Sequence, residues 1–131
     1  MKIPLLLIED NEQNLYLATF LLEQNGFTVV PARSGPEGIE QARRVQPALI
    51  ILDIQLPGMD GYAVANALRQ NPDLQRVPIV AVTSYAMVGD RERALAAGCN
   101  GYIEKPINPD TFRSEIEKYL KAGVAGGGTE S

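Results

Sequence analysis

The stretch Ala48-Leu-Ile-Ile-Leu-Asp53 places five apolar residues directly before a carboxylate. Pro47 precedes it, and the turn-forming sequence Leu56-Pro57-Gly58 follows it. A continuous apolar run of this length, bounded by turn signals, predicts a strand that is buried on both faces, as strands of parallel sheets are. Asp53 would then lie at the carboxyl end of the strand, where ligands bind in open parallel sheets. The sequence therefore makes Asp53 the candidate centre of a functional site.

Similar apolar runs alternate with segments of helical periodicity along the rest of the chain. The remaining predicted strands are residues 3–8, 27–32, 77–82 and 101–104. The predicted helices are residues 11–25, a segment from Ser34 to just before Pro47, a segment through Val64 and Leu68 that ends at Asn71-Pro72, residues 88–97, and a last helix that begins at Asn108-Pro109-Asp110. Strands that alternate with helices in this way form a parallel sheet with right-handed crossovers.

Two of the predicted strands are the least continuously apolar and therefore belong at the edges of the sheet. The strand 27–32 contains Pro31, which cannot donate a hydrogen bond to a neighbouring strand, and the strand 101–104 is short. Strands one, three and four are then central, which gives the order 2-1-3-4-5. The predicted fold class is α/β, a doubly wound (βα)5 sandwich of three layers.

The composition indicates one globular domain, which we expect to span residues 1–122, with a flexible glycine-rich tail at 123–131. The formal net charge of the 131-residue chain is −4, so it has no basic field to hold nucleic acid or an anionic membrane. Cys99 is the only cysteine, and there is no histidine, which excludes an intramolecular disulfide and Ser-His or Cys-His mechanisms. The first apolar run is too short for a signal peptide, which favours a cytoplasmic location.

In this strand order, polar groups from four strands meet at the carboxyl edge of the sheet. The three central strands end at Glu9-Asp10, Asp53 and Thr83-Ser84, and the fifth strand delivers Lys105. Neighbouring carboxylates repel one another unless a cation intervenes, and oxygen ligands suit Mg²⁺. Asp53 could then attack a phosphoryl group, with Mg²⁺ and Lys105 each holding one of its oxygens. The Thr83 hydroxyl and the Ser84 amide could hold others.

These residues closely resemble the receiver domain of two-component response regulators. The resemblance covers about Ile3 to Leu120 and rests on Glu9-Asp10, Asp53 with the following Leu-Pro-Gly-Met-Asp-Gly at 56–61, Thr83, and Lys105-Pro106. It implies a CheY-like, flavodoxin-like fold. It also implies that Asp53 is a phosphoacceptor, which takes its phosphoryl group from a phosphohistidine on a histidine kinase or phosphotransfer protein. The chain would act as a switch and not as an enzyme on another substrate.

The same resemblance implies roles for the residues around Asp53. Asp10, Asp53 and the backbone carbonyl of Gln55 would ligate Mg²⁺ directly, and Glu9 would act mostly through water. A cis peptide bond between Lys105 and Pro106 would aim the lysine into the site.

The resemblance further implies a conformational switch. A phosphoryl group on Asp53 would draw Thr83 inward and leave space for Tyr102 to turn into. For Tyr102 the alternative is an ordinary aromatic on an edge strand. A downstream protein would then bind either the face made by helix 88–97, strand 101–104 and the last helix, or the first helix.

Gln55 and Tyr85 each lie two residues beyond a matched site residue and would flank the path of the water that hydrolyses the acyl phosphate. A bulky Tyr85 should hinder that water, which predicts slow decay of the phosphorylated state. The alternative is that both are solvent-facing loop residues without a kinetic effect.

Glu9-Asp10-Asn11 with Asn14, and residues 83–87 with Gly89-Asp90, resemble the DivK type of single-domain regulator. A receiver fragment of a hybrid kinase and an adaptor that works without phosphorylation remain alternatives. An aspartyl phosphatase of the haloacid dehalogenase kind would need a second Asp where Gln55 stands. A nucleotide binder would need a glycine-rich loop after the first strand, where Glu9-Asp10-Asn11 would repel a phosphate.

Overall fold

The computed structural model describes residues 3–84 and 88–128, in which strands and helices alternate. The strands are β1 (Ile3–Ile8), β2 (Phe27–Ala32), β3 (Leu49–Asp53), β4 (Ile79–Thr83) and β5 (Gly101–Glu104). The helices are α1 (Glu12–Glu23), α2 (Gly35–Val45), α3 (Gly61–Arg69), the short 3₁₀ helix η1 (Pro72–Leu74), α4 (Asp90–Ala96) and α5 (Phe112–Gly128).

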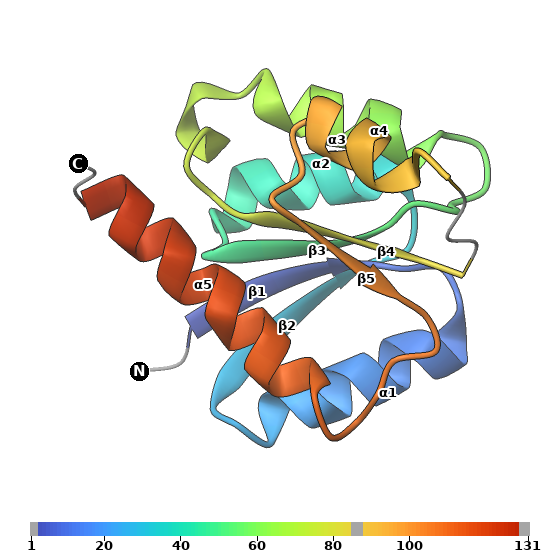
Figure 1. Cartoon of the computed structure of the whole chain (residues 1–131), viewed down its shortest axis with the longest axis vertical. Helices are drawn as coiled ribbons and strands as arrows, with labels where there is room; N and C mark the ends of the chain where they lie inside the picture. Colours follow the sequence, from blue (N-terminus) through green and yellow to red (C-terminus); the bar gives the residue numbers. More distant parts are fainter. Residues whose placement is uncertain (1–2, 85–87, 129–131) are drawn as a thin grey trace.

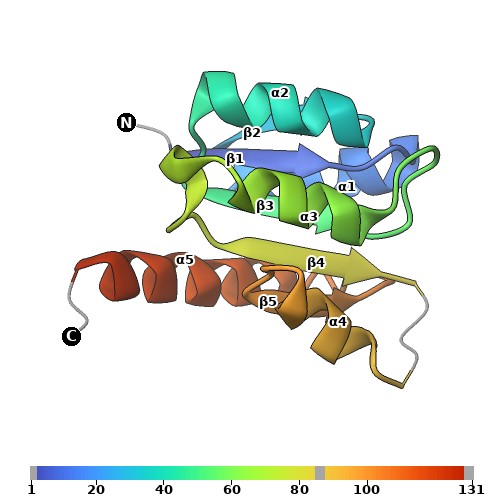
Figure 2. The ribbon, with the colours of Figure 1, turned by 90° about the horizontal axis from the view of Figure 1, so that it is seen from above.

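The strands form one parallel sheet in the order β2-β1-β3-β4-β5, which confirms the predicted order. Helices α1 and α5 cover one face of this sheet, and α2, α3 and α4 cover the other (Figure 1). Figure 2, seen from above, shows the strands side by side, with β2 and β5 at the two edges. The carboxyl ends of the strands therefore share one edge of a three-layer sandwich.

Two hydrophobic cores hold the layers together, because successive side chains of a strand point to opposite faces of the sheet. Leu6 and Ile8 of β1 pack into the core beneath α2, α3 and α4. Leu5 and Leu7 pack into the core against α1 and α5. All five residues of β3 are buried, as the apolar run that precedes Asp53 predicts. Asp53 is thus fixed at the end of the strand that both cores enclose.

The helix starts follow local capping chemistry. The Ser34 hydroxyl accepts a hydrogen bond from the Glu37 amide, and the Glu37 carboxylate accepts one from the Arg33 amide. The side chain of Asn11 likewise accepts from the Asn14 amide at the start of α1. Each cap satisfies a backbone donor that the first turn of a helix leaves without a partner.

The last helix does not begin where the sequence predicts. The Asn108 side chain accepts from the Asp110 amide and closes a turn, and α5 begins only at Phe112. The prediction that Asn108-Pro109-Asp110 opens the helix is therefore wrong, because asparagine stabilises a turn with the same side-chain bond that it uses to cap a helix. Helix α4 also begins later than predicted, at Asp90, after Gly89 in a left-handed conformation (φ 89°).

Helix α5 runs to Gly128 and so passes residue 122, where the sequence predicts the end of the domain. Its buried residues Phe112 and Ile116 lie near its start. The flexible tail at 123–131 remains a prediction, and residues 129–131 lie outside the described part of the chain. No helix within residues 3–84 and 88–128 is long and apolar enough to cross a membrane.

Candidate functional site

The carboxyl edge of the sheet brings together groups from four strands. Glu9 follows β1, Asp53 ends β3, Thr83 ends β4 and Lys105 follows β5. Backbone hydrogen bonds continue the sheet past the strand ends, from the Ile54 amide to the Val82 carbonyl (3.0 Å) and from the Lys105 amide to the Thr83 carbonyl (2.7 Å). This edge lies at the right of the view in Figure 1, on the side opposite the C-terminal end of α5. The site is therefore held by rigid backbone on several strands.

The ammonium group of Lys105 lies between two buried carboxylates. Its Nζ is 3.0 Å from Oε1 of Glu9 and 3.4 Å from Oδ2 of Asp53. The three side chains are 10%, 4% and 3% exposed, respectively. Buried charges require partners of opposite sign, and here one cation serves two anions. The site therefore keeps an excess of negative charge.

The surroundings of Glu9 raise the pKa of its carboxyl group. Burial raises the pKa of the Glu9 carboxyl above its usual value, and the nearby Asp53 carboxylate raises it further. The hydrogen bond and the charge of Lys105 act in the opposite direction and lower it. The net shift is upward, which means that the folded site disfavours the ionised form of Glu9.

A third carboxylate, Asp10, completes an acidic cluster. One oxygen each from Glu9, Asp10 and Asp53 lies within 4.8 Å of the others. Asp10 is exposed while the other two are buried, so the cluster opens to solvent on one side. Three carboxylates without sulfur or imidazole are the donor set that a hard divalent cation such as Mg²⁺ prefers. The residues present therefore fit a magnesium ion.

The connection from β3 to α3 shapes the site below Asp53. The backbone amide of Gln55 donates to Oδ1 of Asp53 at 2.9 Å, and this bond fixes the orientation of the carboxylate. The Gly61 amide reaches the Ile54 carbonyl (3.2 Å), and a Cβ at Gly61 would come within 2.4 Å of the Ile54 Cα. The chain can return this closely only with a glycine at that position.

The Gln55 side chain makes a contact that the sequence does not predict. Its Oε1 accepts a hydrogen bond from the Ser84 amide at 2.9 Å. This bond joins the β3–α3 connection to the residue that follows β4. Sequence reasoning singles out Gln55 for its backbone carbonyl and its place near the site, but no local pattern indicates which distant amide its side chain meets.

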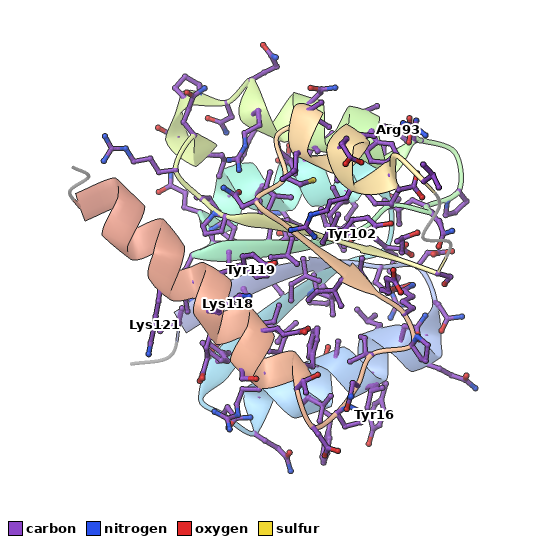
Figure 3. All side chains as sticks on the ribbon, viewed as in Figure 1. Tyr16, Arg93, Tyr102, Lys118, Tyr119 and Lys121 are labelled. Atoms are coloured by element: carbon purple, nitrogen blue, oxygen red, sulfur yellow. The ribbon has the colours of Figure 1, made fainter. Side chains whose placement is uncertain are left out.

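Tyr102 lies on β5 beside α4, and Figure 3 shows its side chain on the same side of the sheet as Arg93. Its ring is partly buried, and its hydroxyl oxygen is buried without a hydrogen-bond partner in the part of the chain that the structure describes. Burial, followed by the charges of Asp90 and Glu104, raises the pKa of Tyr102. A buried hydroxyl without a hydrogen bond raises the free energy of the folded state, so a ring position that gives this hydroxyl a partner would be more stable.

A second aromatic contact joins α3 to α4. The guanidinium carbon of Arg93 lies 4.4 Å from the centre of the Tyr62 ring, and the Tyr62 hydroxyl is 3.5 Å from an oxygen of Asp90. These contacts hold the first turn of α4 against α3. The sequence analysis missed them, because Tyr62 has no motif and its partners are about thirty positions away.

The predicted site residues are otherwise accounted for as follows. Glu9, Asp10, Asp53 and Lys105 come together, Thr83 ends the strand next to β3, and the peptide bond between Lys105 and Pro106 is cis. Ser84 follows directly, and its amide faces Gln55. Glu9, expected to act through water, is a buried partner of Lys105. Tyr85 lies outside the described residues.

Comparison with known proteins gives consistent results. The family described as response regulator receiver domain matches residues 5–117. The polar-differentiation response regulator DivK of Brucella ovis is 42% identical over 115 residues, which cover 88% of this chain and 94% of the relative.

Solved structures agree with this match. The receiver domain of a sensor histidine kinase from Pseudomonas aeruginosa PAO1, described with a magnesium ion coordinated in its active site cleft, has a TM-score of 0.85 and 31% identity over 92% of this chain and 99% of that one. The Vibrio cholerae chemotaxis protein CheY4, at 24% identity, shares the fold with a TM-score of 0.87 and covers 91% of this chain and 99% of its own. The chain thus belongs to the response regulator receiver domain family and has the CheY-like fold.

Proposed function

We propose that the protein is a phosphoacceptor switch of two-component signalling, in which Asp53 receives a phosphoryl group from a histidine kinase or a phosphotransfer protein. One observation carries the proposal. The buried carboxylate of Asp53 stands at the open edge of the sheet, paired with Lys105 and next to the carboxylates of Glu9 and Asp10. A carboxylate held in this way is a nucleophile with a cation ready for the incoming charge.

The proposal includes Mg²⁺ as a cofactor. Asp10, Asp53 and the backbone carbonyl of Gln55 would hold the ion, and Glu9 would contribute mostly through water. A bound divalent cation supplies positive charge that lets a phosphoryl dianion approach the acidic cluster. The three clustered carboxylates and the magnesium ion in the related Pseudomonas aeruginosa receiver domain support this assignment.

The residues of this chain then have separate tasks. A carboxylate oxygen of Asp53 forms a bond to phosphorus while the bond from phosphorus to the donor's imidazole nitrogen breaks, and the imidazole keeps that electron pair. Lys105 neutralises one phosphoryl oxygen, and the Thr83 hydroxyl and the Ser84 amide donate to others. Transfer of this kind needs positioning and charge more than further covalent chemistry from the protein.

The signal would leave the site through a shift between two conformations. Thr83 moves toward the phosphoryl group, and Tyr102 turns into the space beside it. The Tyr102 hydroxyl has no hydrogen-bond partner among residues 3–84 and 88–128, which supports this role, since a second ring position that gives it a partner would be favoured. Gln55 and Tyr85 would flank the path of the water that hydrolyses the acyl phosphate, and the bulky Tyr85 would hinder that water and slow the loss of the phosphoryl group.

Two surfaces are available to protein partners. On α1, the rings of Tyr16 and Phe20 stack with centroids 6.2 Å apart, and Tyr16 is 72% exposed. Figure 3 shows Tyr16 on the side of the sheet opposite Arg93 and Tyr102. On α4, Leu95 is also exposed. We propose that a downstream protein binds the α4–β5–α5 face or α1, since exposed apolar side chains of this size suit protein contacts.

The function is tested by incubating the protein with Mg²⁺ and acetyl phosphate and measuring its intact mass. We expect one added phosphoryl group on the wild type, none on Asp53→Asn, and none without Mg²⁺. Asp60→Asn is the matched control, because Asp60 lies in the same connection and an asparagine retains its cap on the Tyr62 amide. An unmodified wild type would instead favour the adaptor that works without phosphorylation.

The alternative of a hybrid-kinase receiver concerns the surrounding protein and leaves this chemistry unchanged. The likeness to a sensor kinase receiver domain keeps it open.

A further inference from the structure

The Gln55 side chain occupies a hydrogen-bond donor that the proposed function assigns to the phosphoryl group. Its Oε1 accepts from the Ser84 amide at 2.9 Å, while its backbone amide donates to Oδ1 of Asp53 at the same distance. Gln55 is thus hydrogen-bonded both to the proposed nucleophile, Asp53, and to the Ser84 amide, which is proposed to bind the phosphoryl group. The two bonds span the β3–α3 connection and the end of β4.

We propose that Gln55 is a latch, in which its carboxamide holds the Ser84 amide in the unphosphorylated protein and is displaced by a phosphoryl oxygen when Asp53 is modified. This inference rests on the proposed function. A phosphoryl oxygen carries charge and the carboxamide oxygen does not, and hydrogen bonds to charged acceptors are about twice as strong. The exchange therefore favours the phosphoryl group but is opposed by the bond that it must break.

The latch differs from a screen against water. A screen would alter only the rate at which the phosphoryl group is lost, whereas a competitor for the Ser84 amide weakens binding of any phosphoryl-like group at equilibrium. The net strength of a neutral hydrogen bond corresponds to a factor of about two to ten in affinity. Release of Ser84 would also remove a bond between the end of β4 and the β3–α3 connection, so that occupancy of the site and the position of Ser84 are coupled.

Binding of beryllofluoride, a non-covalent phosphoryl mimic, in the presence of Mg²⁺ tests the latch without any transfer step. The variant Gln55→Met keeps the length of the side chain and removes the acceptor. We expect it to bind beryllofluoride about two- to tenfold more tightly than the wild type. Gln55→Glu keeps an acceptor and adds a negative charge, so it should bind more weakly than the wild type. Gln70→Met, an exposed position at the end of α3, is the matched control and should bind as the wild type does.

The Ser84 amide signal in heteronuclear NMR spectra provides the second measurement. In the free protein, Gln55→Met should move the Ser84 amide proton upfield and speed its exchange with solvent, while Gln70→Met should leave it in place. Equal or weaker beryllofluoride binding by Gln55→Met, or an unchanged Ser84 amide, contradicts the latch while wild-type binding upholds the proposed function. If the wild type binds no beryllofluoride with Mg²⁺, the proposed function fails and the latch fails with it.

Discussion

The buried carboxylate of Glu9 lowers the stability of the folded protein when it is ionised. Its carboxylate shares Lys105 with Asp53, and burial together with Asp53 holds its pKa above the usual range. The site keeps unbalanced negative charge, and this makes the folded state less stable when Glu9 is ionised. Replacing a residue that serves such a site is therefore expected to stabilise the folded protein.

The pH dependence of the free energy of unfolding tests whether ionised Glu9 destabilises the fold. Because its pKa is raised in the folded protein, stability from this group is fully present below its unfolded value of 4.5 and is lost as pH rises through the folded pKa. In Mg²⁺-free buffer, Glu9→Gln should therefore remove part of the decline in the free energy of unfolding above pH 4.5. Urea unfolding from pH 4 to 8 measures it, with Glu23→Gln, on the exposed end of α1, as control. Parallel pH profiles for wild type and Glu9→Gln would contradict the account.

Arg69, the last residue of α3, joins more elements than any motif in the sequence indicates. It donates to the carbonyls of Leu74 (2.6 Å), Val77 (2.8 Å) and Gly98 (2.9 Å) and to the Asn100 side chain (2.7 Å). Asn100 in turn accepts from the Ile79 amide. These bonds tie the end of α4 and the starts of β4 and β5 to α3, at the opposite edge of the sheet from Asp53. The far end of α4 is thus fixed, while its first turn is held by the Tyr62 contacts.

Replacement of Arg69 should therefore be costly for folding. Arg69→Met keeps the apolar stem and leaves four acceptors without their donor, so we expect a loss of about 3 kcal/mol in the free energy of unfolding. Arg43→Met should cost less than about 1 kcal/mol, because Arg43 is exposed and its ion pair with Glu40 is long, at 3.7 Å. Chemical denaturation of both variants measures the difference. Equal losses would mean that the Arg69 bonds do not stabilise the fold.

At the level of elements, the sequence predicts correctly those strands and helix starts that depend on neighbouring residues. The buried run before Asp53 and the start of α2 after Ser34 both match the structure. The start of α5 did not, because an asparagine followed by a proline fits a turn as well as a helix cap. The contacts of Arg69, Tyr62 and the Gln55 side chain could not be predicted, since their partners are brought near only by the completed fold.

For the molecule as a whole, the strand order determines where the site residues meet. Once β1, β3 and β4 are central and β5 is their neighbour, Glu9, Asp53, Thr83 and Lys105 must meet at one edge. The sequence was sufficient for that convergence because it follows from topology. It was not sufficient for the pairing within the cluster, where Lys105 lies closer to Glu9 than to Asp53, because this depends on side-chain reach and burial.

The central claim, that Asp53 itself forms the bond to phosphorus, is tested most directly by trapping the acyl phosphate. The protein is treated with acetyl phosphate and Mg²⁺, reduced with borohydride, digested and sequenced by mass spectrometry, since borohydride converts an aspartyl phosphate to homoserine. We predict homoserine at position 53, and unchanged aspartate or glutamate at Glu9, Asp10 and Asp60. A modified residue anywhere other than position 53, or no modified residue at all, would contradict the account.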